Sequence, residues 1–310
     1  MRVHHLDCCT MCPLGRGAVN GEGSLFARAR LVSHCLLIET DAHGLVLVDT
    51  GIGLDDIRDT RRLGAFFGRA MAIDATMTHM AALRQVETLG FRREDVRHLV
   101  LTHLDFDHAG GLPDFPEAKV HVHAKERDAA LARTTFNQKQ RYRSAQFAHG
   151  PAWEVYDALG ESWKGVPAVR QLEGLPSEIL VLPMPGHSRG HAAIAVDTGH
   201  GWLVHAGDAY FHRSVTERGD TSGMPWALRA VERFIAFDYK RVRTNHAFFA
   251  EIAKHNDVTV FSSHDPIEYE RLRAASREST VRSQQHAADD FAPGQFGSAA
   301  PRPVRWRAHG

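Results

Sequence analysis

Runs of apolar residues, many of them β-branched, recur along most of the chain at the length of single strands. The first two runs, residues 31–40 and 44–50, flank a short polar turn and predict a buried hairpin. Further runs predict strands over 96–102, 118–124, 179–184, 192–196, 202–206 and 258–262. The chain is therefore predicted to contain a large β component.

Helical patterns alternate with these strands. The apolar residues at 80, 83, 86 and 89 predict an amphipathic helix that Gly90 terminates. Helices are also predicted over 54–72, 125–147, 226–237 and 241–254. A strand pair followed by alternating helices and strands is typical of a layered α/β fold. We therefore predict an α/β sandwich.

Aromatic residues are scattered through a partly helical excursion at about residues 125–165. They are Phe136, Tyr142, Phe147, Trp153, Tyr156 and Trp163. Two compatible interpretations remain open. The aromatic side chains can form a small core beneath the excursion, or they can shape an apolar substrate pocket under a lid. The pattern slightly favours the lid.

The composition changes near residue 275. Beyond it the chain is rich in Ala, Ser, Gln, Arg, Gly and Pro and poor in apolar residues. We therefore predict one domain over 1–275 and a disordered C-terminal tail over 276–310. No apolar run reaches membrane-spanning length and the N-terminus lacks a signal-peptide core, which predicts a cytoplasmic protein.

Charge bears on the possible binding partners, and cysteine content bears on redox and metal chemistry. Lys+Arg and Asp+Glu number 37 each, so electrostatics gives no argument for a nucleic-acid or membrane partner. Of the four cysteines, Cys9 and Cys12 have the C-x-x-C spacing of redox and metal sites. A second such pair is missing from the sequence, and we predict packed thiols in a folded N-terminal arm.

Histidine is unusually frequent, with 21 residues, so many of these side chains must lie on the surface. In the predicted strand at 118–124, His121 and His123 alternate with Val120 and Val122. This alternation predicts that the two histidines form a solvated strand face.

The chemically richest stretch is THLDFDHAGG at residues 102–111, directly after an apolar strand. It carries four potential metal ligands within six residues, His103, Asp105, Asp107 and His108. Imidazole and carboxylate groups bind zinc, iron or manganese. A polar loop with a helix-capping aspartate is the plainer interpretation, but it does not require four such groups together.

Similar residues follow other predicted strands. Asp49, His187, Asp208 and His264 each come at or shortly after the end of an apolar run. Because ligands on successive strand ends converge on one edge of a sheet, these residues predict a shared site there.

In order and context, these five motifs resemble those of the metallo-β-lactamase superfamily over about residues 30–270. The superfamily has an early Asp, then H-x-H-x-D-H, a His in P-G-H-[ST]-x-G-H, an Asp after Gly, and a late His. The corresponding positions are Asp49, 103–108 with Asp105 in place of the middle His, His187 with His191, Asp208, and His264. The resemblance implies a four-layer αββα sandwich.

The resemblance also implies two divalent metal ions as cofactors. The implied ligands are His103, Asp105 and His187 for the first metal, Asp107, His108 and His264 for the second, and Asp208 between them. Asp49 and His191 would orient ligands rather than bind metal. Such a pair of metals can hold a hydroxide and polarise a carbonyl oxygen, so Asp107 and Asp208 are also candidate catalytic residues.

Two residues make the implied chemistry specific to this chain. Tyr210 can donate to the developing oxyanion or the leaving oxygen, although a packed tyrosine fits the pattern equally well. Zinc is the expected metal, but Asp105 makes the first site harder and more anionic, which favours iron or manganese. Flavodiiron proteins share the fold and carry an acid at this position, but they need a flavin domain that nothing after residue 275 can form.

The length, the excursion and the Asp-x-Tyr at 208–210 resemble the lactonase-like branch of the superfamily. This implies hydrolysis of an ester, with a lactone as the favoured small-molecule substrate. The alternatives are a thioesterase of the glyoxalase II kind, a di-iron oxidoreductase, and a non-catalytic metal-binding protein. The sequence leaves the oligomeric state open, and a homodimer is one of the states it allows.

Overall fold

A computed structural model describes residues 1–64, 66–157, 160–168 and 172–290. Its main sheet has six strands in the order β1 (Arg2–Asp7), β2 (His34–Glu39), β3 (Leu45–Val48), β4 (Val96–Val100), β5 (Lys119–His123) and β6 (Ala152–Tyr156). A four-stranded sheet has the order β12 (Val258–Phe261), β11 (Trp202–His205), β10 (Ala192–Asp197) and β9 (Ile179–Pro183). The strands β7 (Glu161–Trp163) and β8 (Val166–Ala168) form a small separate hairpin.

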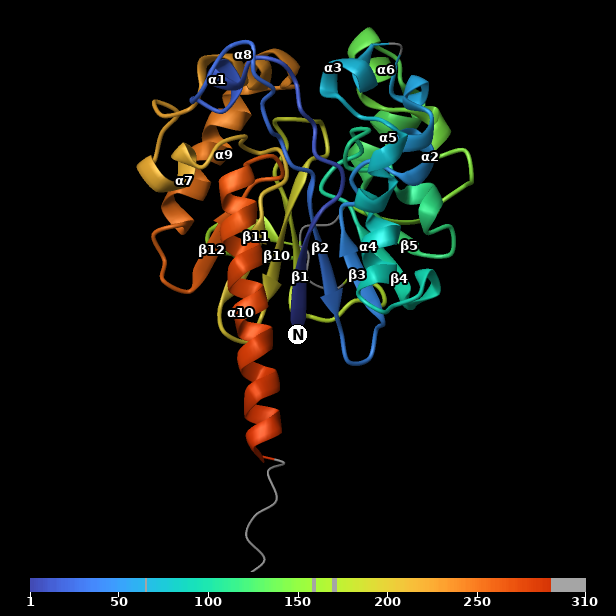
Figure 1. The fold of residues 1–310 in the computed structure, drawn as a ribbon, viewed down its shortest axis with the longest axis vertical. Helices are drawn as coiled ribbons and strands as arrows, with labels where there is room; N and C mark the ends of the chain where they lie inside the picture. Colours follow the sequence, from blue (N-terminus) through green and yellow to red (C-terminus); the bar gives the residue numbers. More distant parts are fainter. Residues whose placement is uncertain (65, 158–159, 169–171, 291–310) are drawn as a thin grey trace, which may run out of the picture.

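Helices flank the two sheets (Figure 1). On one side lie α2 (Leu54–Arg58), α3 (Phe67–Met71), α4 (Ala82–Thr88), α5 (Ala124–Ala132) and α6 (Phe136–Arg141). On the other side lie α1 (Arg16–Val19), α7 (Ser214–Arg218), α8 (Trp226–Ile235), α9 (Tyr239–Ile252) and the long α10 (Pro266–Asp290). Short 3₁₀ turns occupy Thr60–Leu63, Ala75–Met80, Arg93–Asp95, Leu112–Asp114 and Ser144–Gln146.

Three apolar clusters separate four layers. Because successive strand residues point to opposite faces, Leu36 and Ile38 of β2 pack between the two sheets, whereas Leu37 packs under the helices of the first side. The same division holds in β10, where Ile194 faces the other sheet and Ala193 faces the helices of the second side. The αββα sandwich predicted from the sequence is confirmed.

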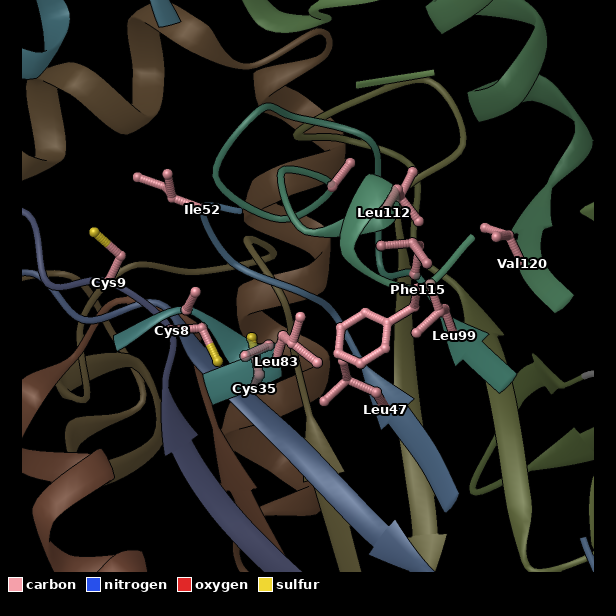
Figure 2. Close-up of a cluster of buried hydrophobic side chains, with 14 of the residues drawn as sticks. Cys8, Cys9, Cys35, Leu47, Ile52, Leu83, Leu99, Leu112, Phe115 and Val120 are labelled. Carbon is pink, nitrogen blue, oxygen red and sulfur yellow. The ribbon is translucent and has the colours of Figure 1, made fainter. Parts of the chain in front are cut away.

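The cluster under the helices of the first side draws on many segments. Figure 2 shows the ring of Phe115 beside the side chains of Leu47 and Leu99, from two neighbouring strands. Cys8 and Cys35 lie in the same cluster and are free and buried, which agrees with the prediction of packed thiols. Their contribution is to packing, as is usual for buried free cysteine.

Strand direction brings several strand ends to one edge. The pairs β3/β4 and β11/β12 are parallel, and β9 runs in the direction of β11 because both are antiparallel to β10. At this edge Ala192 N donates to Thr102 O at 2.8 Å, and His34 N donates to Ser263 O at 3.0 Å. These hydrogen bonds join the two sheets where the predicted ligands follow their strands.

The excursion differs from its prediction. The single helix expected over 125–147 is divided into α5, α6 and a 3₁₀ turn, because α5 ends at Arg133 in a left-handed conformation and Thr135 starts α6 with a capping box. Residues 152–156 form β6, which extends the main sheet. Most of the aromatic side chains, such as Tyr142 and Phe147, belong to the apolar clusters, which favours core packing over a lid.

Of two further predictions, one is confirmed by the structure and the other is wrong. The helix predicted to end at Gly90 is confirmed as α4, and Gly90 has φ +90°. The prediction that His121 and His123 form a solvated face is wrong, because the two side chains are 1% and 8% exposed. His121 lies 2.9 Å from a nitrogen of His98, and His123 Nδ1 accepts from Lys125 N at the start of α5. Burial lowers the pKa of each, so both belong to the protein interior as neutral groups.

At the C-terminal end, α10 continues through residue 290, so residues 276–290 of the segment predicted as a tail are helical. Residues 291–310 lie outside the described part of the chain, and the division near residue 275 stays a prediction. Within the described residues, no helix combines the length and apolarity needed to cross a membrane.

Candidate metal centre

All seven ligands expected from the sequence meet at the shared edge of the two sheets. They form two groups, His103, Asp105, His187 and Asp208 in the first and Asp107, His108 and His264 in the second. Within each group the potential ligand atoms lie within 4.8 Å of one another. Asp107 is the most exposed of the seven side chains, at only 13%. The strand ends therefore build two adjacent clusters of buried ligand atoms.

Asp208 spans the two groups. Its Oδ2 lies 3.3 Å from His187 Nε2 and 3.6 Å from His103 Nε2. Its Oδ1 lies 3.2 Å from His264 Nε2 and 3.3 Å from His108 Nε2. One carboxylate oxygen thus faces each group, which is the geometry of a bridging ligand.

Hydrogen bonds at Nδ1 leave Nε2 of two histidines available. His108 Nδ1 lies 2.8 Å from Asp49 Oδ2, and His264 Nδ1 lies 2.8 Å from the carbonyl oxygen of Val32. Since both partners are acceptors, each Nδ1 keeps its hydrogen, and Nε2 is the nitrogen that can give up a proton and offer its lone pair to a cation. This is the tautomer that a metal-binding histidine needs.

Several of these atoms have close neighbours but make no hydrogen bond to any described residue. His103 Nε2, His108 Nε2 and Asp208 Oδ1 are buried and make no hydrogen bond in that part of the chain. An unsatisfied buried polar atom costs free energy comparable to a lost hydrogen bond. Divalent cations between the groups would satisfy all three atoms, and imidazole with carboxylate is a suitable donor set. The residues present therefore fit a pair of divalent cations.

The carboxylates make the site attractive to positive charge. Burial by itself would lower the pKa of His264, but the Asp208 and Asp107 carboxylates outweigh burial and raise it to about 9. Burial likewise opposes ionisation of Asp208, yet the surrounding imidazoles hold its pKa well below the usual range. Protonated imidazole beside ionised carboxylate is the arrangement that a bound cation can replace.

The two residues expected to orient ligands lie outside both groups. Asp49, at the end of β3, accepts from Thr102 N at 2.8 Å and from Thr102 Oγ1 at 2.7 Å, besides its contact with His108. His191 Nε2 accepts from Asp208 N at 3.0 Å and its Nδ1 lies 3.1 Å from the carbonyl of Met184. Because both His191 nitrogens are engaged, this side chain has no lone pair left for a metal.

Tyr210 lies elsewhere. Its side chain is fully buried, its ring packs near Phe249, and its hydroxyl donates to Glu268 Oε1 at 3.0 Å. The next residue, Phe211, is the one beside the metal groups, with its ring 5.8 Å from that of His187 and 5.5 Å from that of His264. Because the Tyr210 hydroxyl is bound to Glu268, we assign it no part in the proposed reaction.

Sequence reasoning missed two charged residues of the excursion. Arg141 contacts Asp105 with two nitrogens, and Glu126 accepts from the backbone of Leu104 and from residues of the 187–191 loop. The acid at position 105 is a sequence signal for a buried cationic partner, because a buried carboxylate needs one. Nothing in the sequence singles out Arg141 among the other basic residues nearby.

A cavity of about 480 Å³ borders the metal groups at His264 and Phe211. Apolar side chains of Leu31 and Leu228 also line it. A larger cavity of about 830 Å³ lies among β1, α4 and α10, but none of the seven ligands lines it. The smaller cavity is therefore the better candidate for a substrate pocket.

The sequence matches known proteins over most of its length. The profile described as the metallo-beta-lactamase superfamily matches residues 28–246. A Mycobacterium tuberculosis protein named "Probable metallo-hydrolase" is 40% identical over 275 residues, covering 88% of this chain and 83% of the relative. An N-acyl homoserine lactonase of Bacillus thuringiensis is 24% identical over 261 residues, covering 84% and 91% respectively.

Solved structures share the fold. An N-acyl homoserine lactone hydrolase with N-hexanoyl-L-homoserine at its catalytic metal centre superposes with a TM-score of 0.63 at 21% identity, covering 87% of this chain and 95% of the other. AidC, a dizinc quorum-quenching lactonase, superposes with a TM-score of 0.54 at 17% identity, covering 86% and 85%. By the extent of the profile match and its mycobacterial relative, the chain belongs to the metallo-beta-lactamase superfamily.

Proposed function

We propose that the protein is a dinuclear metal-dependent hydrolase that opens ester bonds, with a lactone as its favoured substrate. The observation that carries the proposal is the carboxylate of Asp208, which turns one oxygen toward each of two groups of buried ligand atoms. A protein that needed one structural metal would not require this second set of ligands.

The side chains have distinct roles in the proposed reaction. Two divalent cations held by the two groups would polarise an ester carbonyl and lower the pKa of water to about 7. Asp49 and the Val32 carbonyl keep His108 and His264 in the tautomer that presents Nε2. Asp107 is the most exposed of the seven ligands, so its carboxylate can pass a proton between the site and water. Phe211 packs against two ligand imidazoles and lines the cavity beside them.

A lactone is favoured for two reasons. The N-acyl homoserine lactonase of Bacillus thuringiensis aligns with 84% of this chain. The cavity beside His264, at about 480 Å³, lies in the size range of small-molecule sites, and the apolar side chains of Leu31, Phe211 and Leu228 line it together with several arginines. An acyl lactone has the matching chemistry, an apolar chain attached to a reactive ester.

The test joins metal analysis with a substrate screen. The purified protein is expected to contain two divalent metal ions per chain and to hydrolyse acyl lactones faster than aryl esters or thioesters. His108→Ala should lose one metal and at least a hundredfold in kcat/KM, because it removes a ligand of the second group. The exposed His255, changed to alanine, is the matched control and should alter neither quantity.

Other outcomes would replace the proposal. A preference for thioesters would indicate a glyoxalase II-like enzyme. Bound iron with redox-active spectra and no hydrolysis would indicate an oxidoreductase. Two bound metals without turnover of any of these esters would indicate a metal-binding protein.

A further inference from the structure

The carboxylate of Asp105 is paired along its whole edge with a guanidinium. Arg141 Nε donates to Asp105 Oδ1 at 2.8 Å, and Arg141 Nη2 donates to Oδ2 at 2.7 Å. The two side chains are 14% and 10% exposed. A bidentate Arg–carboxylate pair of this kind is shorter and stronger than an ordinary hydrogen bond, and it fixes the orientation of both planes.

The third guanidinium nitrogen of Arg141, Nη1, is hydrogen-bonded to the backbone. Its Nη1 donates to the carbonyl of His187 at 2.9 Å and to that of Ile235 at 2.7 Å. The guanidinium therefore holds Asp105 and the backbone of His187, two members of the first metal group, in one frame. It reaches that group from the end of α6, in the excursion.

Asp105 still has a lone pair for a cation. Its Oδ2 lies 3.0 Å from His187 Nε2 and 3.5 Å from His103 Nε2, so this oxygen faces the other potential ligand atoms of the group. A carboxylate oxygen can accept from Arg141 and bind a cation at once, because it has two lone pairs. Pairing with Arg141 therefore fits metal binding by Asp105.

Charge distinguishes this arrangement from an unpaired carboxylate. Arg141 is always charged and donates to both carboxylate oxygens of Asp105, which is the pairing of a guanidinium with an ionised carboxylate. An ionised Asp105 together with a protonated Arg141 sums to zero charge. A neutral imidazole, which the superfamily motif has at this position, also carries zero charge.

We propose that Asp105 and Arg141 act as one charge-neutral ligand unit in the first metal group, in place of the imidazole of the superfamily motif, with Arg141 as the positioning residue. The inference rests on the proposed metal centre. It replaces the expectation that Asp105 makes the first site more anionic, because Arg141 offsets the added charge. The unit then retains a preference for zinc that an unpaired carboxylate would shift toward manganese or iron.

The pairing makes the two positions interdependent. Asp105→His alone places a neutral imidazole beside a buried guanidinium, which then lies uncompensated next to bound cations. Arg141→Met alone leaves an unpaired buried carboxylate. The double variant removes both charges and restores the H-x-H-x-D-H pattern, so it should recover what each single change loses.

The experiment compares the wild type, the two single variants and the double variant. Each protein is stripped with a chelator, its thermal midpoint is measured without metal, and it is reloaded with Zn²⁺ and Mn²⁺ in competition before metal analysis. Asp105→His should bind Zn²⁺ in the first group at least tenfold more weakly than the double variant and should unfold at a lower temperature. Arg141→Met should raise the bound Mn²⁺:Zn²⁺ ratio at least threefold over the wild type.

Two further variants separate charge from geometry and from general effects. Arg141→Lys keeps the charge but not the paired donors, so it should keep the wild-type Mn²⁺:Zn²⁺ ratio while binding both metals more weakly. Arg143→Met removes a nearby arginine that donates to backbone carbonyls of Leu63 and Lys139, and it should neither change the ratio nor rescue Asp105→His.

The outcomes distinguish this inference from the proposed function. If Asp105→His alone keeps the wild-type zinc affinity and metal-free thermal midpoint, or if the two single effects simply add in the double variant, the ligand unit is refuted while the hydrolase proposal stands. If the wild type binds no metal, the proposed function and the ligand unit fall together.

Discussion

At the scale of single residues, the role of a side chain follows from what each of its polar atoms contacts. His108 and His191 both belong to sequence motifs of the centre. His108 hydrogen-bonds Asp49 through one nitrogen and makes no hydrogen bond among the described residues through the other, whereas both nitrogens of His191 are hydrogen-bonded. Residue type and motif spacing do not distinguish the two histidines. Only the hydrogen-bond partners separate a candidate ligand from a residue that orients Asp208.

Asp114 shows the same dependence on surroundings outside the metal centre. It is buried, its Oδ2 accepts from Leu54 N at 3.0 Å, and among the described residues it forms no ion pair. Burial, the largest influence, raises its pKa from 3.8 to about 7. The folded state therefore holds the proton of Asp114 more tightly than the unfolded state does.

This raised pKa predicts a pH dependence of stability. The stabilising contribution of protonated Asp114 is complete below its ordinary pKa of 3.8 and is lost as the pH rises through about 7. Over that window the free energy of unfolding should fall by up to about 1.4 kcal/mol per pH unit relative to Asp114→Asn. Urea unfolding of both proteins at several pH values measures the difference. A constant difference across the window would contradict the prediction, and the exposed Asp128→Asn serves as control.

At the scale of elements, a helix or strand could be predicted correctly when the contacts that position it lie close in the sequence. The helix α4 follows from its own apolar spacing and the glycine that ends it, so the sequence was sufficient. The segment after β5 was harder, because its buried positions include the charged residues Glu126 and Arg141 as well as apolar ones. Such a helix is positioned by partners that arrive from distant parts of the chain.

Glu126 connects several elements through its carboxylate, and we call this set of hydrogen bonds the Glu126 brace. Its Oε1 accepts from Leu104 N and Tyr142 Oη, and its Oε2 accepts from Ser188 Oγ at 2.7 Å and Gly190 N at 2.9 Å. A Cβ at Gly190 would lie 2.3 Å from the Glu126 nitrogen, so only glycine allows this close approach. One fully buried carboxylate thus ties α5 to the two loops that carry His103, Asp105 and His187.

We expect Glu126→Gln to lower the free energy of unfolding by about 2–4 kcal/mol, because the amide nitrogen must face donors that the second oxygen now satisfies. Tyr142→Phe removes one of the four hydrogen bonds and should cost about 1 kcal/mol. Chemical denaturation of the metal-free proteins provides both values. A Glu126→Gln variant as stable as the wild type would show that the brace is not required.

At the scale of the whole molecule, the metal groups join the two sheets. Four of the seven ligands follow β4 of the main sheet, and the other three, His187, Asp208 and His264, follow strands of the second sheet. Each group contains residues from both sheets. Cations bound there would connect the two halves of the sandwich at its open edge.

Metal removal should therefore destabilise the fold as well as stop the reaction. A cation present at a hundred times its dissociation constant stabilises the folded state by about 2.7 kcal/mol, so chelation should lower the thermal midpoint by several degrees. Adding Zn²⁺ back should restore it. In Asp208→Ala, which lacks the residue between the groups, the chelator should have a smaller effect. An unchanged midpoint in the wild type would argue against metals that join the sheets.

The sequence alone determined eight of the twelve described strands, the layered class and the residues that gather at the sheet edge, because apolar alternation and ligand position at strand ends are local properties. Tertiary structure alone decided that His121 and His123 are buried, that Phe211 rather than Tyr210 borders the site, and that Arg141 pairs with Asp105. These outcomes depend on which distant segments pack together. A side chain's environment is set by that packing, and neighbours in the sequence do not specify it.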